Sequence, residues 1–134
     1  MTLLGIRLRP GQPIFDQLVF AAKKAFVSGE FTAGQSFPSV RTLAADLKIH
    51  PNTAHKVIQY LIQEGWLVSR PGLGTVVVGE RPELPAKERS RILQQQAEQI
   101  VVEAKRLGLD LEDVIQTVES EWLKLEDPKE VSQT

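Results

Sequence analysis

Cysteine is absent from the sequence and histidine is rare, and both are residue types that build catalytic or metal sites. Its 134 residues include no cysteine and two histidines. The lack of cysteine excludes disulfide bonds, zinc–thiolate sites and thiol catalysis. On a helix, the spacing between His50 and His55 turns the second side chain about 140° from the first, so the two do not share a metal-binding face. We therefore expect no catalytic residue, no metal and no cofactor, and a protein that is not an enzyme.

Long apolar runs are also missing. The segment from Met1 to Gly5 is followed by Arg7 and Arg9, which interrupt any signal-peptide core, and no later run has the length of a membrane helix. Hydrophobic residues make up 42% of the chain and charged residues 25%, as in ordinary globular proteins. We expect a cytoplasmic protein with no membrane partner, built as one domain or as a compact domain with an extension.

Charge is distributed unevenly along the chain, although the formal net charge is only −1. Residues 1–79 hold eight basic and four acidic side chains, a net charge of +4. Residues 80–134 hold eight basic and thirteen acidic side chains, a net charge of −5. This division is typical of a nucleic-acid-binding domain followed by a segment that does not bind nucleic acid.

Two short helices followed by a β-hairpin are predicted within residues 37–78. Ser39 has the side chain of a helix N-cap, and a turn at Lys48–His50 has the length expected inside a helix-turn-helix. Pro51 favours the first position of the second helix, and Gly65 favours the left-handed conformation at its end. The apolar residues at helical spacing are Val40, Leu43, Ala44 and Leu47 in the first helix and Ala54, Val57, Ile58 and Leu61 in the second.

The outward face of the second predicted helix is polar, and a hairpin follows it. This face consists of Asn52, Thr53, His55, Lys56 and Gln59. Asn reads an adenine edge well, Thr bonds phosphates or meets a thymine methyl, and Lys supplies charge to the DNA backbone. Two β-rich runs then flank the turn Pro71–Gly74, which predicts a hairpin. Beside a helix-turn-helix such a hairpin is a wing, with Arg70 near its tip.

The same residues resemble a known family. The matching strings are Pro13-Ile14-Phe15-x-Gln17-Leu18, Gly29-Glu30-Phe31-x-x-Gly34, Phe37-Pro38-Ser39-x-Arg41-x-Leu43-Ala44, Asn52-Thr53, Glu64-Gly65-Trp66-Leu67 and Arg70-x-Gly72-x-Gly74-Thr75-Val76. In this order and spacing they resemble the winged-helix domain of GntR-family bacterial transcription regulators. The run Ile49-x-Pro51-Asn52-Thr53, together with the short remainder of the chain, looks like the YtrA subfamily.

The resemblance implies which residues contact double-stranded DNA. In most of the family a DNA-contacting arginine stands where this chain has Pro51, so the contacts are expected to move to the residues after it. We expect Asn52 and His55 to contact base edges. The expected phosphate contacts are Ser39, Arg41, Thr53 and Lys56, and the expected wing contacts are Arg70, Gly72 and Gly74.

The C-terminal part predicts two helices that pair with a second copy of the chain. Apolar residues step by four and three along 93–107 and again along 111–125, with Gly108 ending the first helix and Asp110 capping the second. Two such helices alone bury little apolar surface, whereas two copies form a four-helix arrangement. The predicted dimer contacts are Leu93, Ile100, Ala104, Leu107, Leu111, Ile115, Val118 and Trp122. The alternative is that these helices pack on their own winged domain.

These patterns together predict a mainly α fold with a small β wing. The predicted parts are a winged helix-turn-helix at 1–78, a linker at 79–85, a helical hairpin for dimerisation at 86–126 and a disordered tail at 127–134. The predicted function is a homodimeric, sequence-specific DNA-binding transcription regulator that represses by occupying a palindromic operator, and the resemblance adds a transporter operon as its target. The alternative is a winged-helix protein-interaction module without direct DNA binding. A small-molecule effector is a further candidate partner.

Overall fold

The computed structural model describes residues 6–78 and 84–125, and each range forms a compact unit of its own. Most of the predicted linker 79–85 and all of the predicted tail 127–134 lie outside the described residues. The domain boundaries inferred from the sequence therefore stay predictions. Among the described helices, none combines the length and the apolar character that a membrane span requires.

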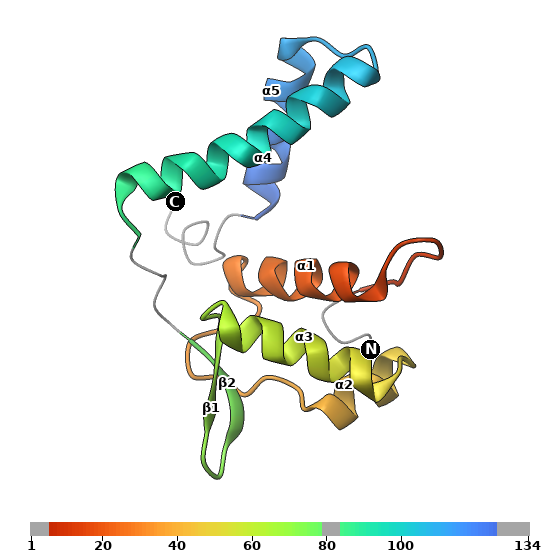
Figure 1. Cartoon of the computed structure of the whole chain (residues 1–134), viewed down its shortest axis with the longest axis vertical. Helices are drawn as coiled ribbons and strands as arrows, with labels where there is room; N and C mark the ends of the chain where they lie inside the picture. The colour runs from red at the N-terminus through yellow and green to blue at the C-terminus, as the bar shows by residue number, and fades with distance from the viewer. Residues whose placement is uncertain (1–5, 79–83, 126–134) are drawn as a thin grey trace. The chain divides into compact units, whose positions relative to one another are not determined.

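The first unit contains three helices and a two-stranded sheet within its described residues (Figure 1). In chain order these are α1 (Ile14–Val27), α2 (Val40–Leu47), α3 (Pro51–Gln63), β1 (Leu67–Arg70) and β2 (Gly74–Val77). The two strands pair antiparallel, with Leu67 opposite Val77 and Arg70 opposite Gly74. With the two helices of the second unit, this confirms the predicted mainly α fold with a small β wing.

The helices of the helix-turn-helix begin and end at their capping residues. The Thr42 amide donates to Ser39 Oγ over 3.1 Å, which caps α2. The amide of Asn52 donates to Nδ1 of His50 over 3.0 Å, so an imidazole caps α3 where Asn, Asp or Ser is usual. Gly65 follows the end of α3 with a φ of +87°, the left-handed conformation that favours glycine. The predicted positions of both helices are thus confirmed.

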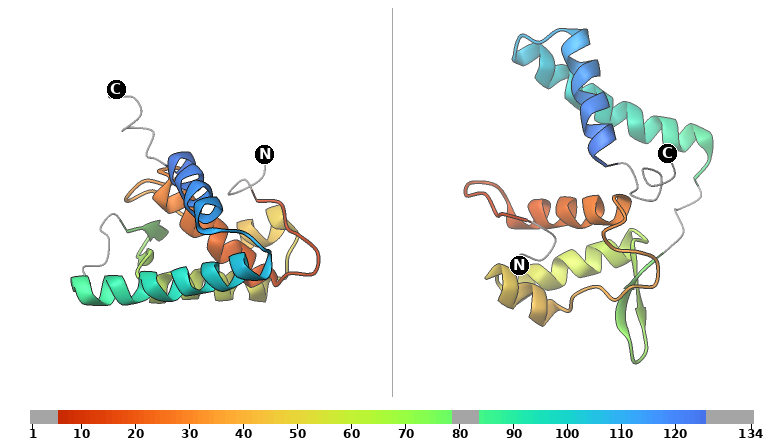
Figure 2. Two further views of the ribbon diagram at one scale, coloured as in Figure 1. Left: turned by 90° about the horizontal axis from the view of Figure 1, so that it is seen from above. Right: turned by 180° about the vertical axis from the view of Figure 1, so that it is seen from behind.

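Helix α3 is the centre of the first unit. It packs against α1, α2 and β1, and Figures 1 and 2 show α1 and α3 lying side by side. Its buried stripe consists of Ala54, Val57, Ile58 and Leu61. The same buried cluster includes Leu18, Val19 and Ala22 of α1, Leu43, Ala44 and Leu47 of α2, and Leu67 of β1. The orientation of α3 is therefore fixed by apolar packing on three sides.

Aromatic rings pack between α1 and the start of the wing. Phe26 stacks on Trp66 with the ring centroids 5.6 Å apart. Phe31 and Phe37 contact Phe26 from the connector before α2, with centroid distances of 6.1 and 5.7 Å. Such pairs contribute about 0.5–1.5 kcal/mol each beyond the area that they bury.

An ion pair joins α1 to the end of α3. Lys23 Nζ lies 2.9 Å from a carboxylate oxygen of Glu64 and 5.4 Å from the centre of the Tyr60 ring. Burial alone would raise the pKa of Glu64, but hydrogen bonds from Lys23 and Tyr60 outweigh it and hold this pKa below its ordinary value. Any stability that this pair adds is therefore present above the unfolded pKa of Glu64 and is lost as the pH falls through the folded pKa.

The wing is anchored at its base by the connector before α2. The Val77 amide donates to the Gln35 carbonyl over 2.9 Å, and the Phe37 amide donates to the Thr75 carbonyl over 2.8 Å. Val77 is buried, whereas the tip at residues 70–74 is exposed. The base of the hairpin is thus part of the core, and its tip projects into solvent.

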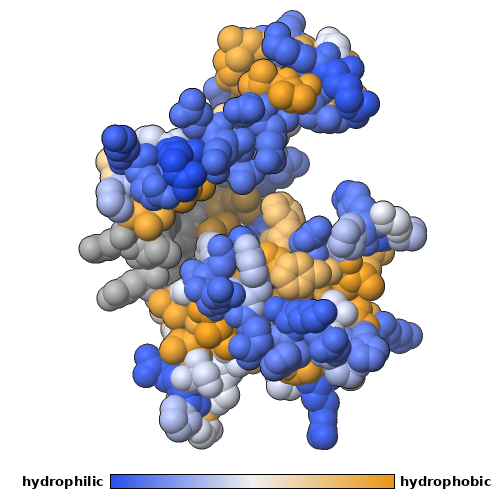
Figure 3. All heavy atoms as spheres, in the orientation of Figure 1, coloured by the Kyte–Doolittle hydropathy of each residue, from blue (hydrophilic) through white to orange (hydrophobic). Residues whose placement is uncertain are grey.

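The second unit is a pair of helices, α4 (Ala86–Arg106) and α5 (Leu111–Lys124). Asp110 and Asp113 form a capping box at the start of α5, with the Asp113 amide 2.9 Å from Asp110 Oδ1. Among the described residues of this unit, Ala104 is the one that is buried. Figure 3 shows apolar residues at the surface where the two helices join. The described residues of this unit therefore bury little of its own apolar surface.

We expect Leu61→Ala to lower the free energy of unfolding by about 2–5 kcal/mol, because it removes apolar contacts at the centre of the first unit and leaves a cavity. Leu61 is fully buried. The matched control is Gln59→Ala on the exposed face of the same helix, which should change stability by less than about 0.5 kcal/mol. Urea denaturation followed by far-ultraviolet circular dichroism measures both variants. An equally small effect of both would contradict the central position of α3.

Candidate nucleic-acid interface

Helix α3 carries two stripes that face in opposite directions. The exposed stripe is Asn52, His55, Lys56 and Gln59, and the buried stripe is Ala54, Val57, Ile58 and Leu61. Both have the i, i+3, i+4, i+7 spacing of one helix face, and an offset of two positions separates them by about 200° around the helix. Packing of the buried stripe therefore decides which side chains α3 presents to solvent.

The first turn of α3 is the part of a recognition helix that usually contacts base edges. Asn52 is exposed in this turn, whereas Thr53 is half-buried. Thr53 lies at the flank of the exposed stripe, where a contact with a phosphate at the groove edge is more accessible than one with a base. His55 and Lys56 are exposed on the next turn.

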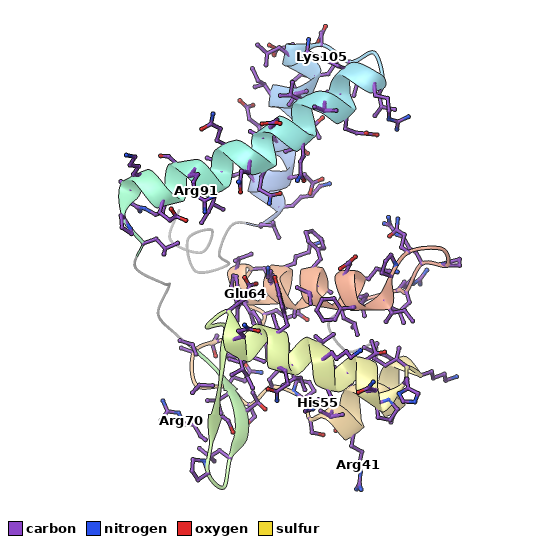
Figure 4. All side chains as sticks on the ribbon, viewed as in Figure 1. Arg41, His55, Glu64, Arg70, Arg91 and Lys105 are labelled. Atoms are coloured by element: carbon purple, nitrogen blue, oxygen red, sulfur yellow. The ribbon has the colours of Figure 1, made fainter. Side chains whose placement is uncertain are left out.

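Ser39 and Arg41 lie at the start of α2, and their side chains are engaged differently. Ser39 Oγ accepts from the Thr42 amide, and its hydroxyl donates to Thr42 Oγ1 over 3.1 Å. The hydroxyl of Ser39 is therefore largely occupied by the helix cap. Arg41 is exposed and extends away from α2 in Figure 4. Of the two phosphate contacts predicted on α2, Arg41 is the better placed.

The tip of the wing is shaped by a tight turn that holds Arg70 outward (Figure 4). The Leu73 amide donates to the Arg70 carbonyl over 3.1 Å, which closes the turn. Gly72 and Gly74 both have a φ of +78°, and a Cβ added to either would meet no atom within 4 Å. The backbone conformation, and not crowding, is therefore what favours glycine at these positions.

The basic side chains of the first unit differ in whether an acidic side chain pairs with them. Lys23 is paired with Glu64, a contact between helices that no sequence spacing predicts. In the part of the chain that the structure describes, no salt bridge involves Arg41, Lys56 or Arg70. These three cations belong to α2, α3 and the wing, so each element of the helix-turn-helix and wing offers a charge that a phosphate can neutralise. Within residues 6–78 and 84–125, no group of three or more His, Asp or Glu side chains is arranged to hold a metal.

Lys48, in the turn between α2 and α3, is strained in a way that the sequence pattern does not reveal. Its φ is +55°, and every other positive φ among the described residues belongs to a glycine. This conformation costs a residue with a Cβ about 1–2 kcal/mol. A cation at an exposed helix C-terminus recovers only about 0.3–1 kcal/mol of that cost. The side chain of the next residue, Ile49, is buried and fixes the turn in the core.

Known proteins share the sequence pattern and the fold. The family described as "Bacterial regulatory proteins, gntR family" matches residues 16–77. The HTH-type transcriptional repressor YtrA of Bacillus subtilis (strain 168) is 27% identical over 122 residues, which cover 91% of this chain and 90% of that protein. The solved structure of YtrA from Sulfolobus acidocaldarius, a GntR-family transcription factor, is 27% identical with a TM-score of 0.56, over 72% of this chain and 97% of that chain.

A third similar protein supports the fold alone. The crystal structure of a transcriptional antiterminator from Listeria monocytogenes EGD-e has a TM-score of 0.79 at 20% identity, over 94% of this chain and 96% of that chain. The relatives that share the family are transcription regulators, which confirms the prediction that the chain is not an enzyme. The matched domain extends from α1 to β2, and the likeness to YtrA continues through the helical unit. Residues 16–77 are therefore a domain of the GntR family of bacterial regulators, and the chain as a whole is similar to transcription regulators of the YtrA type.

Proposed function

We propose that the protein is a homodimeric repressor that binds a palindromic operator in double-stranded DNA. The observation that carries this proposal is the two-sided α3, in which the core holds one stripe and leaves the polar stripe exposed for a major groove. In this proposal Asn52 and His55 contact base edges, because their side chains carry donors and acceptors on the exposed stripe. Residues 1–78 are the DNA-binding domain, and residues 86–126 are the dimerisation segment.

The remaining contacts in this proposal position the protein on the DNA backbone. Arg41, Thr53 and Lys56 contact phosphates around the recognition helix, with Ser39 in reach once its hydroxyl leaves Thr42. At the wing, Arg70 supplies positive charge, and Gly72 and Gly74 contact the DNA backbone. Phosphate contacts set the register of α3 in the groove and leave sequence reading to Asn52 and His55.

The exposed surface of α3 disfavours the alternative of a protein-interaction module. No large apolar side chain of α3 is among the exposed ones. An interface core is depleted of charged residues and enriched in aromatic and apolar ones, which this stripe does not offer. The cations on α2, α3 and the wing form no salt bridge with any described residue and suit a polyanion instead.

The second unit supplies the reason to propose a dimer. Its predicted seam residues Leu93, Leu111 and Trp122 are 70%, 72% and 72% exposed. Four further seam residues have exposed fractions of 41–55%: Ile100, Leu107, Ile115 and Val118. The last seam residue, Ala104, is buried. So large an uncovered apolar surface is unusual for a monomeric protein, and pairing of two copies into a four-helix arrangement would bury it.

Dimerisation would let two DNA-binding domains bind the same operator at once. Two recognition helices that are held about 34–36 Å apart enter successive turns of the major groove and bind both halves of a palindrome. The first contact makes the second one intramolecular, so the dimer binds more tightly than either domain alone. Occupation of the operator then blocks transcription, in line with the relative that is named a repressor. The resemblance to the YtrA subfamily extends this proposal to a transporter operon as target and leaves a small-molecule effector as a further partner.

We expect Asn52→Ala and Lys56→Ala to weaken DNA binding in different ways. Asn52→Ala removes a base contact, so it should cost about 1–3 kcal/mol on the preferred duplex and little on a scrambled one. Lys56→Ala removes a phosphate contact, so it should weaken both duplexes alike and reduce the slope of log affinity against log salt by about 1 for each protomer. Fluorescence anisotropy with the duplex upstream of the protein's own coding region, and with a scrambled duplex of equal length, measures both.

The matched control for these variants is Gln63→Ala, an exposed change at the far end of α3. It should leave both affinities unchanged. If Asn52→Ala and Lys56→Ala lost the same affinity for every duplex, the proposed division between base and phosphate contacts would be wrong.

We expect Trp122→Ala to raise the dissociation constant of the dimer at least about thirtyfold, because a large exposed aromatic on the seam is the best anchor for an interface. Leu123→Ala is the matched control, since Leu123 is 65% exposed but lies off the seam, so it should leave the dimer intact. Sedimentation equilibrium measures both variants. A wild-type chain that stays at the monomer mass of 14.9 kDa would overturn the proposed dimer.

A further inference from the structure

The turn between α2 and α3 holds two polar side chains that the proposed interface does not use. Lys48 and His50 are exposed, and the residue between them, Ile49, is buried. The Ile49 amide also donates to the Ala44 carbonyl over 3.1 Å, which ties the turn to α2. Because a core side chain anchors the middle of the turn, its two neighbours are held at the surface beside the first turn of α3.

The conformation of Lys48 is unfavourable for a lysine and favourable for a glycine. Its φ of +55° lies in the left-handed region, where glycine has no steric penalty. A helix-turn-helix turn often contains glycine for this reason. Strained residues of this kind cluster at functional sites, and the strain at Lys48 therefore indicates a role for its ammonium group. In the described part of the chain, Lys48 forms no salt bridge.

The cap of α3 settles the proton position on His50. Its Nδ1 accepts the Asn52 amide proton over 3.0 Å, so Nδ1 carries no proton of its own. In the neutral imidazole the proton then resides on Nε2, which becomes a hydrogen-bond donor. This donor belongs to an exposed side chain directly before the recognition helix.

We infer that Lys48 and His50 together bind one DNA phosphate, as a backbone contact in addition to those assigned to α2, α3 and the wing. Lys48 supplies the charge and His50 supplies a directional N–H donor to the same phosphate group. This inference rests on the proposed DNA-binding function and deepens it. The contact fixes the entry of α3 into the groove at the end where Asn52 lies, and it carries no sequence information of its own.

The test uses the full chain and measures anisotropy with the upstream duplex and with its scrambled counterpart over a range of salt concentrations. Lys48→Gly should weaken binding to both duplexes by the same factor, about eightfold for each lost contact at 0.1 M salt. It should also reduce the slope of log affinity against log salt by about 0.9 for each protomer. Glycine accepts the left-handed φ, so the thermal midpoint should not fall, and Lys48→Arg should restore both affinity and slope.

His50→Asn removes the proposed Nε2–H donor to the phosphate and keeps an N-cap for α3. Asn keeps an acceptor at the place of Nδ1 and is among the preferred N-caps, but it has no group at the place of Nε2. This variant should weaken both duplexes without a change in the salt slope, because a neutral donor releases no counterion. Lys24→Ala, an exposed change of the same charge on α1, is the control and should change neither affinity nor slope.

The outcomes distinguish this inference from the proposal beneath it. If the wild-type chain binds DNA with a steep salt slope and Lys48→Gly has the same affinity and slope, the phosphate contact is wrong and the DNA-binding proposal stands. A loss on only one of the two duplexes would also overturn it, since it would indicate a base contact. If the wild-type chain binds neither duplex at low salt, the proposed function fails and the phosphate contact fails with it.

Discussion

Burial of one stripe of α3 is the constraint on which the rest of the first unit depends. Val57 and Leu61 on this stripe are almost completely buried, and the helix packs against α1, α2 and β1 at once. The helix has no freedom to rotate without exposing this apolar surface. The polar stripe on the opposite face is consequently held at a fixed angle to α2 and to the wing. A recognition surface of this kind is therefore a product of the core beneath it.

The two units divide the physical tasks of a DNA-binding regulator between them. The first unit is closed by its own apolar core and leaves cations exposed on α2, α3 and the wing. The second leaves its apolar seam exposed, and its residues 84–125 hold eight acidic and six basic side chains, a net charge of −2. A negative surface repels the DNA backbone, so it is suited to protein contacts and not to nucleic acid. In this account, affinity for DNA comes from the first unit, and the pairing of two such units comes from the second.

Much of this organisation follows from local sequence rules. Ser39, Pro51 and Gly65 predict the ends of α2 and α3, because each acts through its own backbone or cap. Asp110 predicts the start of α5 for the same reason. The apolar spacing of α3 identifies both of its faces, since a helix has one period.

The features that the sequence did not reveal depend on contacts between helices, on the backbone conformation of a turn or on the orientation of a side chain. Lys23 meets Glu64 across two helices, and no periodicity relates these positions. The strain at Lys48 comes from the geometry of a turn whose next residue must reach the core. The capping role of His50 depends on the rotation of its ring, which residue type alone does not specify. All three features lie beside an end of α3. Tertiary packing therefore shapes the surroundings of the helix that is proposed to bind DNA.

The account is tested most directly by the binding of the wild-type full chain to DNA, measured by fluorescence anisotropy at several salt concentrations. The duplex upstream of its own coding region is compared with a scrambled duplex of equal length. The account predicts tight binding to the first duplex alone, two chains for each duplex and a steep fall in affinity as salt rises. Absence of binding to both duplexes at low salt would contradict it, because the exposed stripe of α3 would then not be a DNA-binding surface.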